Sequence, residues 1–237
     1  KPSSFAKPQI EQTVGIDKLS DEDPVKNYLL QQRKLTLETL KAFDVAVMRR
    51  DVALPFKCNG ELLQVKYLRI DRLKDKKQIR VEKNCQPCLF GWQALDPDAR
   101  TIVLTEGEID AMTLNQYGFP ALSLPFGGGK GSKQAWLEYE FDRLACFDQI
   151  YLCLDQDNVG QQTANYLVER LGRYRCLLVS LPFKDANECL QKEVSLEIMQ
   201  RCFDQAKNCD PDELKSASSF VGDVVKIFHP PDNELAG

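Results

Sequence analysis

The chain has 237 residues, and 43% of them are hydrophobic, which is enough for one or two domains with a substantial core. The 31 Lys and Arg residues against 35 Asp and Glu give a net charge of −4, which excludes a globally basic nucleic-acid binder but not a local basic face. No apolar run approaches the roughly 18–20 residues of a membrane span, and the first residues contain no apolar signal-peptide core. We therefore expect no membrane partner.

Nine cysteines and a single histidine limit the chemistry. The cysteines are odd in number, and Cys153 and Cys176 lie in apolar, strand-like runs, which indicates buried thiols in a reducing compartment such as the cytoplasm. Cys85 and Cys88 form a CxxC without a second pair, which predicts a turn rather than a zinc site. With only His229 present, chemistry must depend on carboxylates, Lys, Arg or Cys.

The N-terminal part predicts short helices followed by strands. Residues 1–22 are polar and are expected to form a flexible lead-in. Asp23 and Pro24 are typical of a helix start, and a second short helix is predicted over 36–43. Alternating segments at 61–70 and 79–83, joined by charged residues, predict an antiparallel hairpin. These features together predict a small α+β subdomain over residues 24–98.

The remaining chain alternates between strands and helices. Strands are predicted at 101–105, 121–124, 149–155 and 175–181. Helical segments follow them at 109–118, 134–144, 160–172 and 186–191. Four such units predict an α/β domain with a four-stranded parallel sheet and helices on both faces. One more amphipathic helix at 193–206 completes the expected domain, 99–207, and 208–237 is expected to be a linker.

Acidic side chains follow three of the four predicted strands. In open α/β sheets, sites form outside the carboxyl ends of the strands. Asp155 and Asp157 are two residues apart, so an extended backbone turns both the same way, and Glu106 follows a strand expected about 5 Å away. Asp110 and Asp185 are expected at the same edge of the sheet, beside the carboxyl ends of its strands. Carboxylates without His favour Mg²⁺ or Mn²⁺, although Asp-x-Asp alone is also typical of a helix cap.

Two basic segments are candidates for phosphate contact. The glycine-rich loop at 125–133 does not match the spacing of known phosphate-binding loops, and we interpret it as a flexible loop with Lys130 and Lys133 available to phosphates, or as a plain surface loop. The hairpin carries a second cluster, which is either a solvated rim or a contact for a nucleic-acid backbone. Its members are Arg69, Arg72, Lys74, Lys76, Lys77, Arg80 and Lys83.

At these residues the sequence resembles a TOPRIM domain, the fold shared by primases, type IA and type II topoisomerases and some nucleases. The matching segments are VLTEGEIDAMTL (103–114), CLDQDNVGQQTA (153–164) and LPFKDANECL (181–190). The resemblance is strongest to the primase, or RNA polymerase, domain of phage-type bifunctional primase-helicases, which are related to Twinkle. It covers about 100–192 and extends weakly back to about 55, which implies a TOPRIM catalytic domain over 99–207.

This resemblance implies a DNA primase that makes short RNA primers from NTPs on a single-stranded DNA template. Its expected partners are the template, NTPs and a replicative helicase domain. The family's zinc module and helicase P-loop are not in this sequence, so we expect an excised central fragment. A phage or prophage origin is expected, with an organelle left open. Two alternatives remain: a TOPRIM nuclease, and a non-catalytic DNA-binding segment of a replicative helicase.

The resemblance also implies roles for individual residues. Asp155 and Asp157 would hold Mg²⁺ or Mn²⁺, and Glu106 would bind the metal or act as acid and base. Supporting acids in the same mouth would be Asp110 and Asp185. Contacts to the nucleotide or the template would come from Arg80, Lys83 and Lys133.

Overall fold

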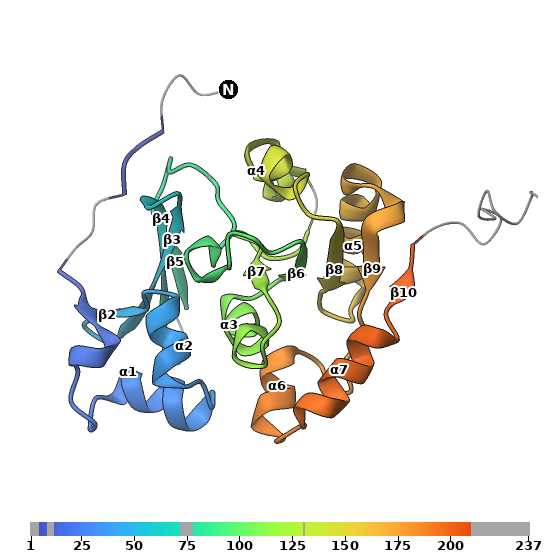
Figure 1. Cartoon of the computed structure of the whole chain (residues 1–237). Helices are drawn as coiled ribbons and strands as arrows, with labels where there is room; N and C mark the ends of the chain where they lie inside the picture. Colours follow the sequence, from blue (N-terminus) through green and yellow to red (C-terminus); the bar gives the residue numbers. More distant parts are fainter. Residues whose placement is uncertain (1–4, 9–11, 72–77, 130, 210–237) are drawn as a thin grey trace, which may run out of the picture.

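The computed structural model describes residues 5–8, 12–71, 78–129 and 131–209. Two five-stranded sheets, each with its own helices, lie next to each other in the molecule (Figure 1). Within the described residues, no helix combines the length and the apolar character that crossing a bilayer requires. Most of the basic hairpin loop, at 72–77, and nearly all of the predicted linker, from 210 onward, lie outside the described residues.

The N-terminal half is an antiparallel sheet with two short helices. Its strand order follows the sequence: β1 (Val14–Gly15), β2 (Ala46–Met48), β3 (Asp51–Cys58), β4 (Glu61–Arg69) and β5 (Ile79–Val81). Helix α1 (Pro24–Asn27) begins where predicted, because Asp23 Oδ1 accepts hydrogen bonds from the backbone N–H groups of Val25 and Lys26 at 2.8 and 3.0 Å. Thr36 caps α2 (Leu37–Ala42) in the same way.

The structure corrects part of the expected flexible lead-in over residues 1–22, of which 1–4 and 9–11 lie outside the described residues. Val14 and Gly15 pair with β2, and Ile16 is only 1% exposed within the core. The pairing of β4 with β5 confirms the predicted hairpin, whereas β1 and β2 were not predicted, and β3 lies in a region interpreted as strand-like from about residue 52 without a separate strand being assigned. The subdomain therefore begins before residue 24 and is a full sheet rather than a hairpin with helices.

The C-terminal half contains the predicted parallel sheet. Its strands lie in the order β10-β9-β8-β6-β7, with bounds β6 (Thr101–Thr105), β7 (Ala121–Ser123), β8 (Gln149–Cys153), β9 (Cys176–Leu178) and β10 (Lys207–Asn208). The pairs β6–β7, β6–β8 and β8–β9 are parallel, which confirms the four-stranded arrangement. The short β10 adds to β9 in the antiparallel sense, and the sequence did not predict it.

Helices cover both faces of this sheet, as predicted. One face carries α3 (Glu108–Gln116), α6 (Ala186–Gln191) and α7 (Leu196–Asp204), and the other carries α4 (Leu137–Leu144) and α5 (Asn158–Leu171). The alternation along β6 explains this arrangement: Ile102 and Leu104 pack in the cluster with α4 and α5, and Val103 packs in the cluster with α3, α6 and α7. All three side chains are at most 1% exposed.

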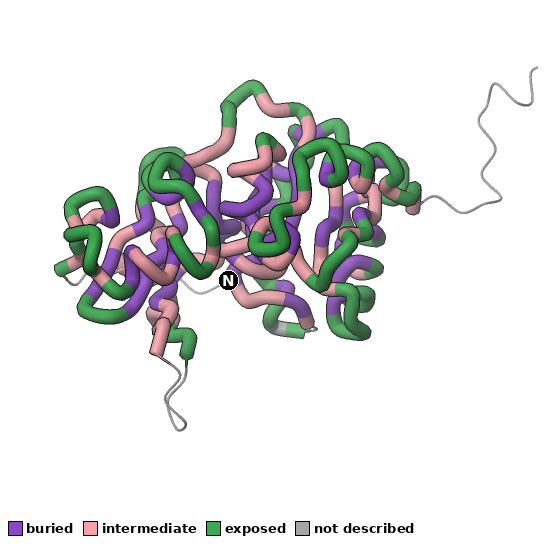
Figure 2. The backbone as a smooth tube through the Cα atoms, turned by 90° about the horizontal axis from the view of Figure 1, so that it is seen from below, coloured by how far each residue is buried: buried purple, intermediate pink, exposed green. Residues whose placement is uncertain are grey.

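The two halves share one hydrophobic cluster. The Phe90 ring lies 5.2 Å from the rings of both Phe43 and Phe56, centroid to centroid, and the Phe90 backbone pairs with Ser123 of β7. The same cluster includes Val103 of β6. Buried residues consequently run through both halves and exposed residues follow the outline (Figure 2). The expected boundary at residue 98 separates two sheets but not two cores.

Candidate active site

Glu106 leaves the end of β6 in a tightly fixed turn. The Thr105 hydroxyl donates to the Gly107 carbonyl at 3.0 Å, and the backbone N–H of Gly128 donates to Glu106 Oε2 at 2.8 Å. A Cβ on Gly107 would lie 2.7 Å from Asp110 Oδ2, so a larger residue at this turn would displace the Asp110 carboxylate. The other oxygen, Glu106 Oε1, is buried without a hydrogen-bond partner among the described residues. Burial raises the pKa of Glu106, and the nearby carboxylates of Asp155 and Asp157 raise it further.

Asp155 and Asp157 follow β8 and have different partners. Asp157 caps α5, with Oδ1 accepting from the N–H groups of Val159 and Gly160 at 2.9 and 2.8 Å. Burial raises the pKa of Asp155, the carboxylates of Asp185 and Asp157 add to this, and Lys184 opposes it. A Cβ on Gly160 would lie 1.9 Å from the Asp155 carbonyl oxygen. Only glycine therefore allows α5 to start this close to the acidic turn.

Asp110 and Asp185 complete the acidic edge. Asp110 Oδ1 accepts a hydrogen bond from the backbone N–H of Asn187 at 3.0 Å, which ties α3 to α6. Asp185 caps α6 by accepting from the Glu188 N–H at 2.7 Å. Burial raises the pKa of Asp110 to about 7, and the Asp185 carboxylate contributes. A small hollow at this edge is lined by four acids and one lysine: Glu106, Asp110, Asp155, Asp185 and Lys184.

The basic residues are distributed unevenly around this edge. Lys133 Nζ donates to the Gly128 carbonyl at 3.1 Å, beside the peptide that holds Glu106. Lys184 lines the acidic hollow; it follows the fourth predicted strand, but the sequence analysis gave it no role. Lys130 lies outside the described residues.

The structure does not bring Arg80 or Lys83 to the acids. The Arg80 guanidinium lies 4.2 Å from the centroid of the Tyr67 ring, and Tyr67 belongs to a cluster on the face of the small sheet opposite Lys66. Arg80 lines a hollow of about 490 Å³ there, together with Arg49, Arg50 and Arg69. Asp71 and Asp51 line the same hollow and form ion pairs with Arg50 and Arg69. Lys83 is exposed just after β5.

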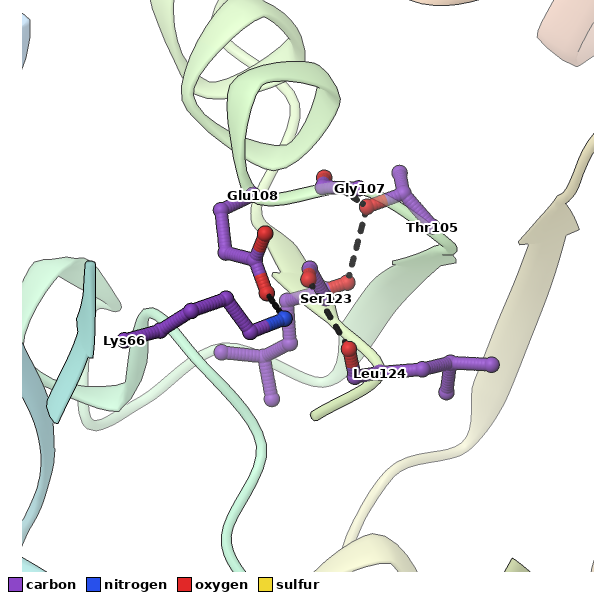
Figure 3. A network of polar contacts seen from close by, with 7 residues as sticks. Lys66, Thr105, Gly107, Glu108, Ser123 and Leu124 are labelled. Carbon is purple, nitrogen blue, oxygen red and sulfur yellow. Dashed lines mark hydrogen bonds and ion pairs between the residues drawn. The ribbon is translucent and has the colours of Figure 1, made fainter. Parts of the chain in front are cut away.

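A buried ion pair joins the small sheet to the turn that carries Glu106 (Figure 3). Lys66 Nζ, from β4, donates to Glu108 Oε1 in the first turn of α3, and the two side chains are 7% and 10% exposed. The ammonium also lies 5.5 Å from the centroid of the Phe56 ring. Because Glu108 is two residues after Glu106, the N-terminal half helps to fix the acidic turn.

The donor set fits a divalent cation by its chemistry. Carboxylate oxygens are the ligands that Mg²⁺ and Mn²⁺ prefer, and the buried, unpartnered Glu106 Oε1 is one such donor. Mutual repulsion contributes to the raised pKa values of Glu106 and Asp155, and a cation would relieve it. Over the described ranges, no three His, Cys, Asp or Glu side chains are grouped closely enough to hold one ion as they lie. The oxygen donors therefore lie at one edge of the sheet, but as they lie they do not form a coordination site.

Comparison with known proteins gives a consistent picture. A family model described as Toprim-like matches residues 103–190. The chain is 35% identical over 137 residues to a DNA helicase/primase of Enterobacteria phage T3, covering 56% of this chain and 24% of the phage protein. It is 29% identical over 206 residues to a primase homolog protein of Arabidopsis thaliana, covering 77% of this chain and 58% of the plant protein.

Among solved structures, the primase fragment of the bacteriophage T7 primase-helicase protein superposes with a TM-score of 0.61 at 26% identity, covering 72% of each chain. The chain thus spans about a quarter of the phage T3 relative and just over half of the plant relative.

Proposed function

We propose that this chain, which resembles the TOPRIM primases in sequence and in fold, is the catalytic core of a DNA primase that joins NTPs into short RNA primers on single-stranded DNA. The observation that carries the proposal is the gathering of acids around one hollow at the carboxyl edge of the parallel sheet. Burial raises the pKa values of Glu106, Asp110 and Asp155, and repulsion between these neighbouring carboxylates adds to the increase. An acidic edge of this kind suits a nucleoside triphosphate, whose phosphates bind divalent cations.

We assign Glu106, Asp155 and Asp157 to a Mg²⁺ or Mn²⁺ site, with Asp110 and Asp185 as supporting acids. When bound, such a cation neutralises the triphosphate and lowers the pKa of the attacking 3′-hydroxyl. The protein positions the donors: the Gly128 N–H holds one oxygen of Glu106, and the α5 cap holds Oδ1 of Asp157. Those contacts use one oxygen of each carboxylate, so we assign the second oxygens of Glu106 and Asp157 to the cation.

We assign the basic residues to two different phosphates. Lys184, beside Asp155, and Lys133, beside Gly128, are placed to meet the triphosphate of an incoming nucleotide. Arg80 and Lys83 are assigned to the template backbone, because the hollow that Arg80 lines on the outer face of the small sheet has a net positive charge, with four arginines against Asp51 and Asp71. Such contacts would position the strand without reading its sequence.

We propose that the chain functions beside a replicative helicase domain, since the phage T3 relative combines helicase and primase in its name. All nine cysteines lie within the described residues and none of them forms a disulfide, which supports our proposal of a reducing compartment, in a phage-infected cell or an organelle. We propose Mg²⁺ or Mn²⁺ as the cation because the donors are carboxylate oxygens.

The test is template-directed synthesis. The chain is incubated with single-stranded DNA, labelled NTPs and either Mg²⁺ or Mn²⁺, and labelled oligoribonucleotides are the expected product. Glu106→Gln and Asp155→Asn should abolish synthesis, whereas Asp142→Asn, a matched change at an exposed position on α4, should retain it. Shortened DNA would indicate a nuclease, binding without product would indicate a DNA-binding segment, and full synthesis by Glu106→Gln would contradict the assigned site.

A further inference from the structure

The short strand β10 brings two cysteines opposite each other at the outer edge of the parallel sheet (Figure 1). β10 pairs with β9 in the antiparallel sense, with Lys207 opposite Leu178 and Asn208 opposite Leu177. Continued by one residue, this register places Cys209 opposite Cys176, the first residue of β9. Helices α6 and α7 separate the two cysteines along the chain, and neither cysteine forms a disulfide.

The spacing of opposed residues in such a strand pair suits a disulfide. Directly opposed residues of an antiparallel pair have Cα atoms about 4.5 or 5.5 Å apart, depending on whether they exchange hydrogen bonds. Disulfides join residues whose Cα atoms are about 4.4–6.8 Å apart. Both kinds of opposed position fall within that range, so a bond between Cys176 and Cys209 requires no change of the strand register.

The packing of the side chains places both thiols on the same face of the sheet. Cys176 is fully buried in the hydrophobic cluster that includes α4 and α5, and the half-buried Cys209 packs against this cluster. All nine cysteines lie within the described residues, and only these two belong to that cluster. Cys153, Cys189 and Cys202 pack in the cluster on the α3, α6 and α7 face. Strand register and side-chain packing therefore bring the same two thiols together.

The two thiols differ in their access to solvent. Cys176 is fully buried, and burial raises its pKa to about 11, with a contribution from the nearby Cys209 and against the effect of Arg175. Cys176 consequently stays protonated at neutral pH and is shielded from solvent. Cys209 is partly exposed, so it is the thiol that a small oxidant reaches first.

A bond at this position would fasten a strand that is otherwise held by few contacts. The pairing of β10 with β9 covers two residues of each strand, and both residues of β10 are exposed. Lys207 of β10 lines a hollow of about 400 Å³ that Asp155 and Gly160 also line, next to the acidic edge. A covalent bond one residue beyond β10 would therefore fix one wall of this hollow.

We propose that Cys176 and Cys209 form a reversible cross-strand disulfide in the presence of hydrogen peroxide, and that this bond fastens β10 to the parallel sheet. The Cys209 thiolate attacks one peroxide oxygen and the O–O bond breaks, which gives Cys209 sulfenic acid and a hydroxide that takes up a proton to form water. The Cys176 sulfur then displaces the sulfenic hydroxyl, which leaves with the Cys176 proton as a second water, and the S–S bond forms. Two thiols are oxidised and one hydrogen peroxide is reduced to two waters. In a reducing compartment the bond is transient, because cellular thiols reduce it again.

The first experiment maps the disulfides of the full chain. The reduced protein receives one equivalent of hydrogen peroxide, the remaining thiols are blocked with iodoacetamide, and unreduced peptides are identified by mass spectrometry. A peptide pair joined through Cys176 and Cys209 is expected, on a chain that stays monomeric on a non-reducing gel. Cys146→Ser, which removes an exposed thiol, and Cys202→Ser, which removes a thiol from the other face of the sheet, should leave this bond unchanged. In Cys176→Ala, Cys209 should stop at the sulfenic acid and react with dimedone. Absence of the joined pair from wild type, with Cys209 unmodified, overoxidised or bonded to another cysteine, would overturn the proposal.

The second experiment tests whether the bond fastens β10. In oxidised wild type, the backbone amides of Lys207 and Asn208 should exchange hydrogen more slowly than in the reduced protein, and the melting temperature should rise by roughly 5–15 °C. Dithiothreitol should reverse both effects. Cys209→Ser, a near-isosteric change at a half-buried position, is the matched control and should show neither effect after the same peroxide treatment. Equal exchange rates in the oxidised and reduced wild type would contradict the fastening of β10. None of these readouts depends on primer synthesis.

Discussion

Replacing Lys66 by Met tests the buried ion pair that links the two halves. The change removes the ammonium but keeps an unbranched side chain of similar length, so Glu108 is left with an uncompensated carboxylate that is only 10% exposed. Removing one partner of a buried pair costs about 3–5 kcal/mol, because the remaining charge has been taken out of water. The N-terminus of α3 offsets about 0.3–1 kcal/mol of this, since Glu108 lies in the first turn of that helix.

The free energy of unfolding is measured by urea denaturation, followed by circular dichroism. Lys66→Met should lower it by about 3 kcal/mol, and Lys66→Met/Glu108→Leu should recover most of the loss, because an apolar pair replaces the buried charges. The control is Lys57→Met, which breaks a pair with Asp44 whose side chains are 33% and 48% exposed and should cost no more than about 1 kcal/mol. A loss below about 1 kcal/mol for Lys66→Met, or a double variant as unstable as the single one, would refute this reasoning.

Further substitutions at the acidic edge separate structural from chemical roles. Asp157→Ala should lose about 1 kcal/mol through the α5 cap, whereas Asp157→Ser should keep the cap. Both should lose primer synthesis, and melting of Asp157→Ala at the wild-type temperature would contradict the capping role. Without divalent cations, Asp110 binds its proton more tightly in the folded state, because its pKa is about 7 there against 3.8 in the unfolded chain. The free energy of unfolding should therefore fall as pH rises between those two values. Urea titrations of Asp110→Asn should lack this part of the pH dependence. Gly160→Ala should melt far below wild type because its Cβ would overlap the Asp155 carbonyl, and an unchanged melting temperature would rule out that contact. Mg²⁺ should raise the melting temperature of wild type more than that of Glu106→Gln; an equal rise would place the cation elsewhere.

The parallel sheet could be predicted because its signals are local. Apolar segments such as 101–105 are followed by helices that end at glycines, for example Gly118 and Gly172, and this pattern requires no knowledge of distant contacts. The acidic edge follows from the same logic, since the carboxyl ends of parallel strands meet. The gathering of Glu106, Asp110, Asp155 and Asp185 was therefore accessible from the sequence, although the metal and catalytic roles remain proposals.

Other features depend on contacts that the sequence does not display. Strands β1, β2 and β10 have only two or three residues, which is too short for an alternating pattern, and β3 contains Pro55, which argues against a strand inside a sheet. Lys66 and Glu108 are 42 positions apart. Arg80 lies on the outer face of the small sheet because β5 pairs with β4 in the register that places Arg80 opposite Tyr67. A register shifted by one residue would turn the Arg80 side chain to the inner face.

The aromatic contact of Phe43, Phe56 and Phe90 limits how the protein can be dissected. A polypeptide that starts at residue 99 would lose all three rings and the Phe90 backbone partner of Ser123, and it would present the apolar α3 side of its sheet to water. Exposed patches of this kind promote association. Domain exchange between related proteins would consequently succeed only when both halves, with their complementary surfaces, are transplanted together.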